Sequence, residues 1–286
     1  MFPLAAAFIA AAVALAHPQP NVLFSVLEGS DGLAIEPIAM VTKTPGTCAG
    51  CWKLTFAEPP DTDEFRTRYY RPGRTYHVLV GGAEVGTARV TKEASLGCVS
   101  LAASVDVTPP LPKESPIGLA VGSLRIAPRK QDLYEETDAE EKAFRSLAEK
   151  AFRARGVPAT LFKDMEGSFL STDLNGDGKR DLIGSFEAYD HKATDSRDYH
   201  RLFLIAMADD AGGYRTEYVW YHLLGKGKSE NSTETLQLFD TIDLDEDGTD
   251  EVIVRNSFYE SYEYEILKRA PSGKWTIVYK GGGSGC

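Results

Sequence analysis

Two short acidic segments of one pattern constrain this fold more than any other feature. Residues 173–181 are Asp-Leu-Asn-Gly-Asp-Gly-Lys-Arg-Asp, and residues 243–251 are Asp-Leu-Asp-Glu-Asp-Gly-Thr-Asp-Glu. Both place oxygen-bearing side chains at positions 1, 3, 5 and 9 and glycine at position 6. A hard cation such as Ca²⁺ takes about six to eight oxygen ligands, and alternate residues of a tight loop can supply them. The pattern therefore predicts an internal repeat with two cation-binding turns.

The surrounding residues argue against the calcium loop of an EF-hand. That loop needs a bidentate glutamate at its twelfth position and a helix on either side. The corresponding residues here are Gly184 and Val254. The flanks alternate as strands, with 236–238 leading into the second loop and 251–254 leaving it. Each loop is therefore predicted to be a turn between two β-strands.

Strand-like runs follow both loops in the same order. They are 202–208, a turn at 209–213 and 214–221 after the first loop, then 262–267, a turn at 271–273 and 275–279 after the second. A four-stranded meander of this size is the unit of a β-propeller blade. We expect residues 160–286 to form two blade-like meanders with a cation in the first turn of each.

The run Asp-Leu-Asn-Gly-Asp-Gly-x-x-Asp-Leu at 173–182 and its echo at 243–252 resemble the FG-GAP/VCBS-type repeats of integrin-like β-propellers and of many exported bacterial proteins. The resemblance implies a structural Ca²⁺ ion in each loop and surfaces used for binding. The ligands that it implies are Asp173, Asn175, Asp177, Asp181 and the Lys179 carbonyl in the first loop, and Asp243, Asp245, Asp247, Glu251 and the Thr249 carbonyl in the second.

The chain also departs from that family. The Phe-Gly and Gly-Ala-Pro elements are absent, Glu251 stands where the pattern has aspartate, and only two blades fit into residues 160–286. Two blades cannot close a seven-bladed ring. The resemblance makes no statement about residues 17–156.

The second loop carries more negative charge than the first. It offers four carboxylates, whereas the first offers three and the amide of Asn175. Crowded carboxylates repel one another without a cation, and greater ligand charge generally favours a divalent ion. We therefore expect the second loop to bind Ca²⁺ more tightly than the first.

The N-terminal region, residues 17–128, is expected to form a small β barrel or sandwich. Gly81-Gly82 lies between two strand-like runs and predicts a tight hairpin. The break at 127–130 follows a proline-rich stretch and marks the end of this domain. The predicted strands are 33–41, 51–57, 74–80, 83–90 and 98–107.

One amphipathic helix is predicted within the linker at 129–159. Thr137 and Glu140 have the spacing of a capping box, an apolar stripe runs from 144 to 152, and Gly156 ends the helix. The stripe is expected to pack on the β structure.

The first residues predict export. Residues 4–15 are apolar but too short to span a bilayer. Ala14-Leu15-Ala16 supplies a signal-peptidase pattern, so residues 1–16 are expected to be a signal peptide, although no Lys or Arg precedes the apolar run. No later segment predicts a transmembrane helix. The protein is therefore expected to be secreted or periplasmic.

The four cysteines are expected to form two disulfides, because export places them in an oxidising compartment. They are Cys48, Cys51, Cys98 and Cys286, and all three pairings stay open. Cys48 and Cys51 also have the spacing of a redox motif or of half a zinc site. The strand-like residues after them favour a structural bridge.

Charge and motifs leave two classes of function. The net charge of −11 argues against binding to nucleic acid or an anionic membrane. The preferred class is a calcium-stabilised binding or scaffold module for a protein or glycan partner outside the cytoplasm. The alternative is an extracytoplasmic hydrolase-type enzyme with a site around residues 188–201. No catalytic spacing supports it, so no catalytic residue is assigned. Its candidate side chains are Asp190, His191, Asp195, Asp198, His200 and His222.

Overall fold

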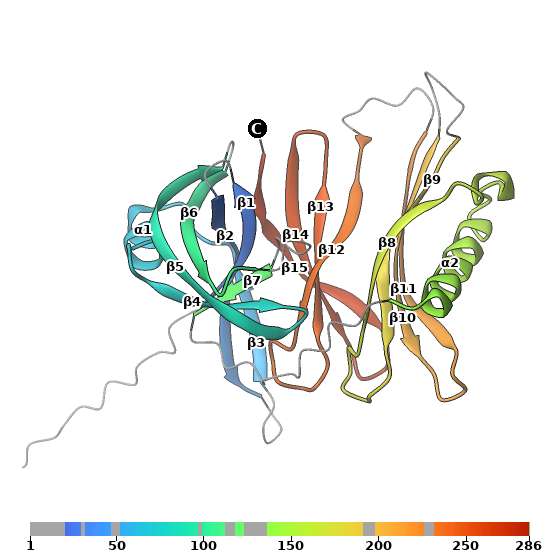
Figure 1. Ribbon diagram of the computed structural model, residues 1–286, viewed down its shortest axis with the longest axis horizontal. Coiled ribbons are helices and arrows are strands. Elements are labelled where there is room, and N and C mark those ends of the chain that lie inside the picture. Colours follow the sequence, from blue (N-terminus) through green and yellow to red (C-terminus); the bar gives the residue numbers. More distant parts are fainter. Residues whose placement is uncertain are drawn as a thin grey trace, which may run out of the picture.

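The computed structural model describes residues 21–29, 32–46, 52–96, 99–111, 118–122, 136–190, 198–225 and 232–285. It confirms a mainly β protein with an N-terminal six-stranded barrel, a long helix and two four-stranded antiparallel sheets (Figure 1). The predicted signal peptide, the four cysteines and the predicted boundary at 127–130 lie outside the described residues.

Six strands close into the barrel, and a seventh strand pairs with one of them from outside the ring. The ring runs β1-β7-β4-β5-β6-β2 and returns to β1, while β3 pairs with β2 outside it. Gly81 and Gly82 join β4 to β5 with φ of 58° and 72°, as the expected tight hairpin requires. The strands are β1 (Asn21–Gly29), β2 (Gly32–Pro45), β3 (Trp52–Ala57), β4 (Thr75–Val80), β5 (Ala83–Leu96), β6 (Val99–Thr108) and β7 (Gly118–Val121).

A short helix, α1 (Asp63–Tyr69), was not predicted, because seven residues are too few to show an apolar stripe. Its first turn is capped by the Thr62 hydroxyl, which accepts from the Phe65 backbone N–H at 3.2 Å. The helix contributes Phe65 and Tyr69 to the aromatic core of the barrel, in which the ring of Phe24 packs against Tyr69.

Two meanders and a helix complete the chain. The first meander comprises β8 (Glu166–Thr172), β9 (Asp181–Ala188), β10 (Tyr199–Ala208) and β11 (Tyr214–Leu224). The second comprises β12 (Thr235–Ile242), β13 (Glu251–Ser257), β14 (Ser261–Arg269) and β15 (Trp275–Gly285). Helix α2 (Asp138–Arg153) and the short helix η1 (Ala159–Leu161) precede them. The predicted turns at 209–213 and 271–273 join neighbouring strands of the same sheet.

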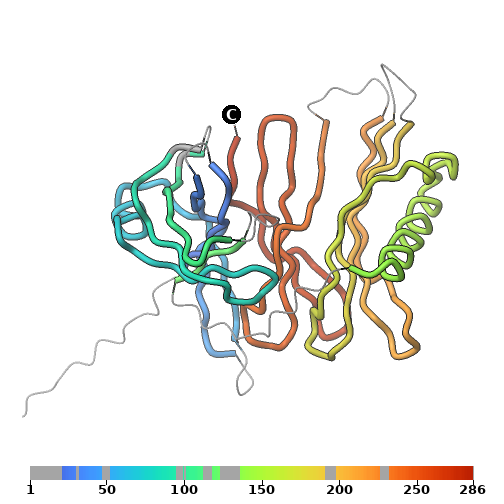
Figure 2. The backbone as a smooth tube through the Cα atoms, in the orientation of Figure 1, coloured from blue at the N-terminus to red at the C-terminus, as the bar shows by residue number. Residues whose placement is uncertain are grey.

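These units form a row, with the barrel at one end, then the second meander, the first meander and α2 (Figure 2). Each neighbouring pair buries an apolar layer. Phe144, Ala148 and Phe152 of α2 are fully buried against the first meander, as the stripe predicted. The Thr137–Glu140 capping box is also present, with Glu140 Oε2 2.8 Å from the Thr137 N–H. Between the meanders lie Ile183 and Val252.

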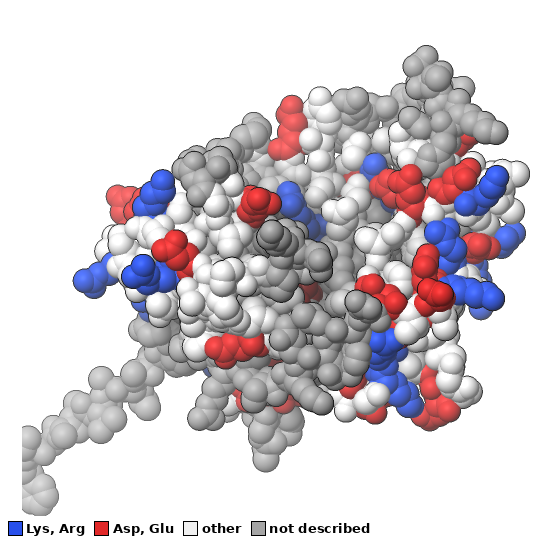
Figure 3. Space-filling model, viewed as in Figure 1, with Lys and Arg blue, Asp and Glu red and all other residues white. Residues whose placement is uncertain are grey.

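On the face drawn in Figure 3, acidic and basic side chains are interspersed over α2 and the first meander. In the described part of the chain, no helix has the length and hydropathy needed to cross a membrane.

Candidate metal centre

The two acidic loops are built alike, each between the first two strands of its meander. In the first loop the carboxylate of Asp173 accepts from the backbone N–H groups of Asp177 at 3.2 Å and Gly178 at 2.8 Å. In the second, Asp243 accepts from Asp247 at 3.1 Å and Gly248 at 3.0 Å. The side chain at position 1 therefore holds the loop closed in both repeats.

Later loop positions also match. The N–H at position 7 donates to the side chain at position 5 in both loops, from Lys179 to Asp177 and from Thr249 to Asp247, each at 2.9 Å. The carboxylate at position 9 likewise accepts from the N–H of position 2, at 3.0 Å for Asp181 and 2.7 Å for Glu251. The repeat in the sequence is thus a repeat in backbone geometry.

Glycine is needed where the chain turns. Gly178 and Gly248, at position 6, have φ of 80° and 89°, which only glycine adopts without strain. Position 4 is also left-handed in both loops, at 71° for Gly176 and 61° for Glu246. The second loop therefore holds a glutamate in a conformation that costs an L-residue roughly 1–2 kcal/mol.

In the second loop three of the five predicted ligands converge. One carboxylate oxygen from each of Asp243, Asp245 and Asp247 lies within 4.8 Å of the others, a spacing that can hold a metal ion. Asp243 and Asp245 are each only 6% exposed. Asp245 Oδ1 is buried and has no hydrogen-bond partner among the described residues. The donor set therefore suits a hard cation.

A lysine that the sequence analysis missed lies among these carboxylates. The Lys268 ammonium on β14 is 2.7 Å from Asp245 Oδ2, 2.9 Å from Asp247 Oδ2 and 2.7 Å from Glu251 Oε1. Burial lowers the pKa of Lys268, but the surrounding carboxylates, of which Glu251 has the largest effect, raise it by more. The second loop is therefore supplied with a cation by the chain itself.

The first loop has different surroundings. Its tip is exposed, and the ammonium of its own Lys179 pairs with Asp210 at 2.6 Å, outside the ligand set. Asp181 is buried, and this burial raises its pKa to about 6 against the effect of N–H donors from Ala208 and Leu174. The amide of Asn175 lies 3.3 Å from Asp177 Oδ2. Among the described residues, Asp173, Asp177 and Asp181 do not converge as the acidic residues of the second loop do.

The two loops lie side by side, and the second also touches the barrel. The Asp250 N–H donates to the Leu174 carbonyl at 2.7 Å, which joins loop to loop. On the other side, Glu246 pairs with Lys43 of β2 at 2.9 Å. Asp240, just before the second loop, accepts from the Gly81 N–H at 2.8 Å. The second loop is consequently the more buried of the two.

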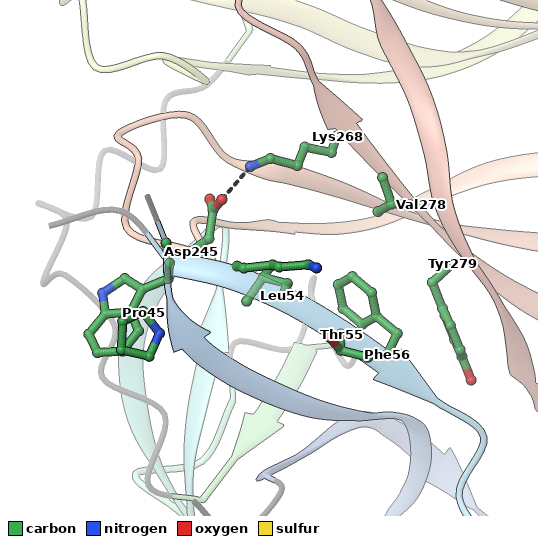
Figure 4. Close-up of a pocket in the computed structure, with 11 residues that line it drawn as sticks. Pro45, Leu54, Thr55, Phe56, Asp245, Lys268, Val278 and Tyr279 are labelled. Carbon is green, nitrogen blue, oxygen red and sulfur yellow. Dashed lines mark hydrogen bonds and ion pairs between the residues drawn. The ribbon is translucent and has the colours of Figure 1, made fainter. Parts of the chain in front are cut away.

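A cleft of about 780 Å³ opens beside the second loop, between β3 and the second meander. Asp245 and Lys268 lie at one end of it, and Phe56 and Tyr279 lie together at the other (Figure 4). The centroids of these two rings are 5.6 Å apart. The other lining residues are Pro45, Gly46, Trp52, Lys53, Leu54, Thr55 and Val278.

The two described histidines of the enzyme alternative, His200 and His222, lie toward opposite faces of the first meander. His200 is 8% exposed and bonds the Tyr221 hydroxyl at 2.8 Å, and burial lowers its pKa. Tyr221 packs on the α2 side of the sheet, whereas His222 stacks on Trp220, which packs on the opposite side. His191 and Asp195 lie outside the described residues, and Asp190 and Asp198 lie at the edges of that gap.

A signal for Lys268 does exist in the sequence. Leu182 pairs with Ala206 and Val252 pairs with Leu267, so the next residue along the returning strand is Met207 in the first repeat and Lys268 in the second. Aligning the strands after the loops, and not only the loops, exposes this difference.

No protein family, curated protein or solved structure compared with the chain matches it. The site is therefore defined by its geometry.

Proposed function

We propose that this is an exported calcium-binding protein, in which Ca²⁺ stabilises a binding or scaffold module for a protein or glycan partner. The meanders would be two FG-GAP/VCBS-type blades. The observation that carries the proposal is the convergence in the second loop, where one carboxylate oxygen from each of Asp243, Asp245 and Asp247 lies within 4.8 Å of the others. The first loop shares the hydrogen bonds that close this turn.

The calcium part is tested by thermal melts of the purified protein in chelator and in excess Ca²⁺. Binding to the native state alone stabilises by about 2.7 kcal/mol at a hundredfold excess over the dissociation constant. The melting temperature should rise with Ca²⁺ and fall with chelator, and Mg²⁺ at the same concentration should do less because it prefers a smaller octahedral site. Identical melts in chelator and Ca²⁺ would remove the metal assignment.

The cleft beside β3 supports the partner part of the proposal. Apolar and aromatic walls with a few polar groups at one end are typical of a ligand site. Val278 lines it, is 41% exposed and lies next to Ile277, which is 37% exposed and does not line it. A Val278→Glu variant should lose binding in a screen of soluble oligosaccharides and proteins from the same compartment. Ile277→Glu is the matched control, and equal binding by both variants would place the partner elsewhere.

A further inference from the structure

The Lys268 ammonium lies among carboxylates that are predicted to bind an ion in the second loop. Its ammonium lies at 2.7–2.9 Å from oxygens of three of the four acidic ligands predicted there. These are hydrogen-bond distances of a charged donor to carboxylates. An ion at about 2.3–2.6 Å from the same oxygens would stand within the space that the ammonium fills.

The two cations exclude each other. A Ca²⁺ ion and a protonated lysine would share Asp245, Asp247 and Glu251 at contact distance, and like charges at that separation repel strongly. For the ion to enter, Lys268 must withdraw its ammonium from all three carboxylates. Its side chain is 28% exposed and lines the cleft beside the loop, so only partial solvation would compensate for the three lost bonds.

The first loop lacks the corresponding residue. Met207 stands where the pairing register places Lys268 in the second repeat, and a thioether carries no charge. Met207 is 3% exposed and packs between the meanders. The lysine in the first loop itself points to Asp210.

We propose that the Lys268 ammonium is the resident cation of the second loop, so that any Ca²⁺ taken up by the wild-type chain enters the first loop alone. This deepens the proposed calcium-binding function and rests on it. It reverses the affinity order expected from ligand charge, because the more acidic loop already holds a cation. The second turn is then fixed in the presence and in the absence of calcium.

The test is a calorimetric Ca²⁺ titration of the full chain and of Lys268→Met, which gives the second repeat the residue of the first. The wild type should bind one ion, and Lys268→Met should bind two. Lys274→Met is the matched control, because it removes the same charge from an exposed position in the turn before β15 and should leave one ion bound. Asp177→Ala should remove the ion from the wild type and leave one in Lys268→Met.

A second variant, Lys268→Gln, and thermal melts in chelator show whether a Lys268 variant fails to fold. Both Lys268 variants should melt lower than the wild type in chelator and recover in Ca²⁺, since four acidic side chains then lack a cation. A variant that folds only with Ca²⁺ would also support the inference.

The outcomes separate this inference from the calcium proposal. Two ions in the wild type would overturn the inference and leave calcium binding intact. No ion in the wild type and one in Lys268→Met would support it while removing calcium from the first loop. The inference would also be overturned if both Lys268 variants bound as many Ca²⁺ ions as the wild type, or if Asp177→Ala alone still bound one ion.

Discussion

The two acidic loops share a backbone but not an environment. The first is exposed at its tip and pairs with Glu140 of α2 through Arg180, whereas the second lies between the first loop and the barrel. Strand β14 directs Lys268 into the second loop, and the matching strand of the first meander carries Met207. A ligand pattern therefore specifies the shape of a cation site, while the neighbouring strand decides which cation fills it.

The largest expected effect concerns the buried leucine of each loop. Leu174 is 0% exposed between the meanders, and Leu244 is 1% exposed between the second meander and the barrel. Replacing either by alanine should cost about 2–5 kcal/mol through lost contacts and a cavity. Urea unfolding of the two variants checks this. A much smaller loss at Leu174 would show that the first loop is held by its ion more than by packing.

Ca²⁺ at a hundredfold excess over its dissociation constant should stabilise the folded protein by about 2.7 kcal/mol through the first loop and not through the second. That stabilisation should disappear in Asp177→Ala and persist in Asp247→Ala, which keeps the first loop intact. Melts of each variant with and without Ca²⁺ measure it. Loss of the stabilisation in Asp247→Ala and its persistence in Asp177→Ala would agree with ligand charge alone and would count against Lys268 as the resident cation.

A pH-dependent difference is expected at Asp240. Burial raises its pKa to about 7, despite N–H donors from Thr241 and Gly81, and the residue at the same offset before the first loop is Leu170. A carboxyl group with a raised pKa in the folded state does not destabilise the fold at low pH, where it is protonated. It lowers the free energy of unfolding progressively as the pH rises from about 4 to about 7.

Asp240→Asn keeps an acceptor for both N–H donors and removes this charge. It should raise stability at pH 8, by an amount on the order of 2 kcal/mol, and leave stability at pH 4 nearly unchanged. Leu170→Asn is the control, because it changes the same offset before the first loop without removing a charge. An equal gain at both pH values would show that charge is not the cause.

The smallest effect should come from position 4 of the second loop. Glu246→Gly relieves its left-handed strain but removes the pair with Lys43 at 2.9 Å. Strain relief of roughly 1 kcal/mol and loss of a partly exposed ion pair worth about 0–1 kcal/mol nearly cancel. Gly176→Ala introduces the strain with no compensating pair and should destabilise by about 1 kcal/mol. Thermal melts compare the two, and a marked loss in Glu246→Gly would show that the contact with the barrel outweighs the strain.

The sequence predicted those features that are local. The strand alternation, the Gly81-Gly82 hairpin, the Thr137 capping box and the turn residues of both meanders depend on neighbours within a few positions, and the structure confirms them. The loop geometry was predicted for the same reason, since the hydrogen bonds by which Asp173 and Asp243 close their turns lie within each loop.

Features that depend on distant residues were predicted in part or missed. The sequence left a barrel and a sandwich open, because closure requires β1 to pair with both β2 and β7, which are far apart in the chain. The Lys268 contacts join β14 to a loop before β13, and periodicity within one strand cannot reveal them. Glu36 is 1% exposed and accepts from the hydroxyls of Tyr262 and Tyr264, both at 2.6 Å, across the interface of barrel and meander.

The row of units also bears on how such a protein can grow over evolutionary time. Repeat arrays lengthen by duplication when each new unit finds an open face of the preceding one. Here α2 covers the outer face of the first meander, and the barrel covers the outer face of the second. A third meander could be added to either end only by displacing one of these terminal units and exposing its apolar layer to water. The helix and the barrel thus close the described array at two meanders.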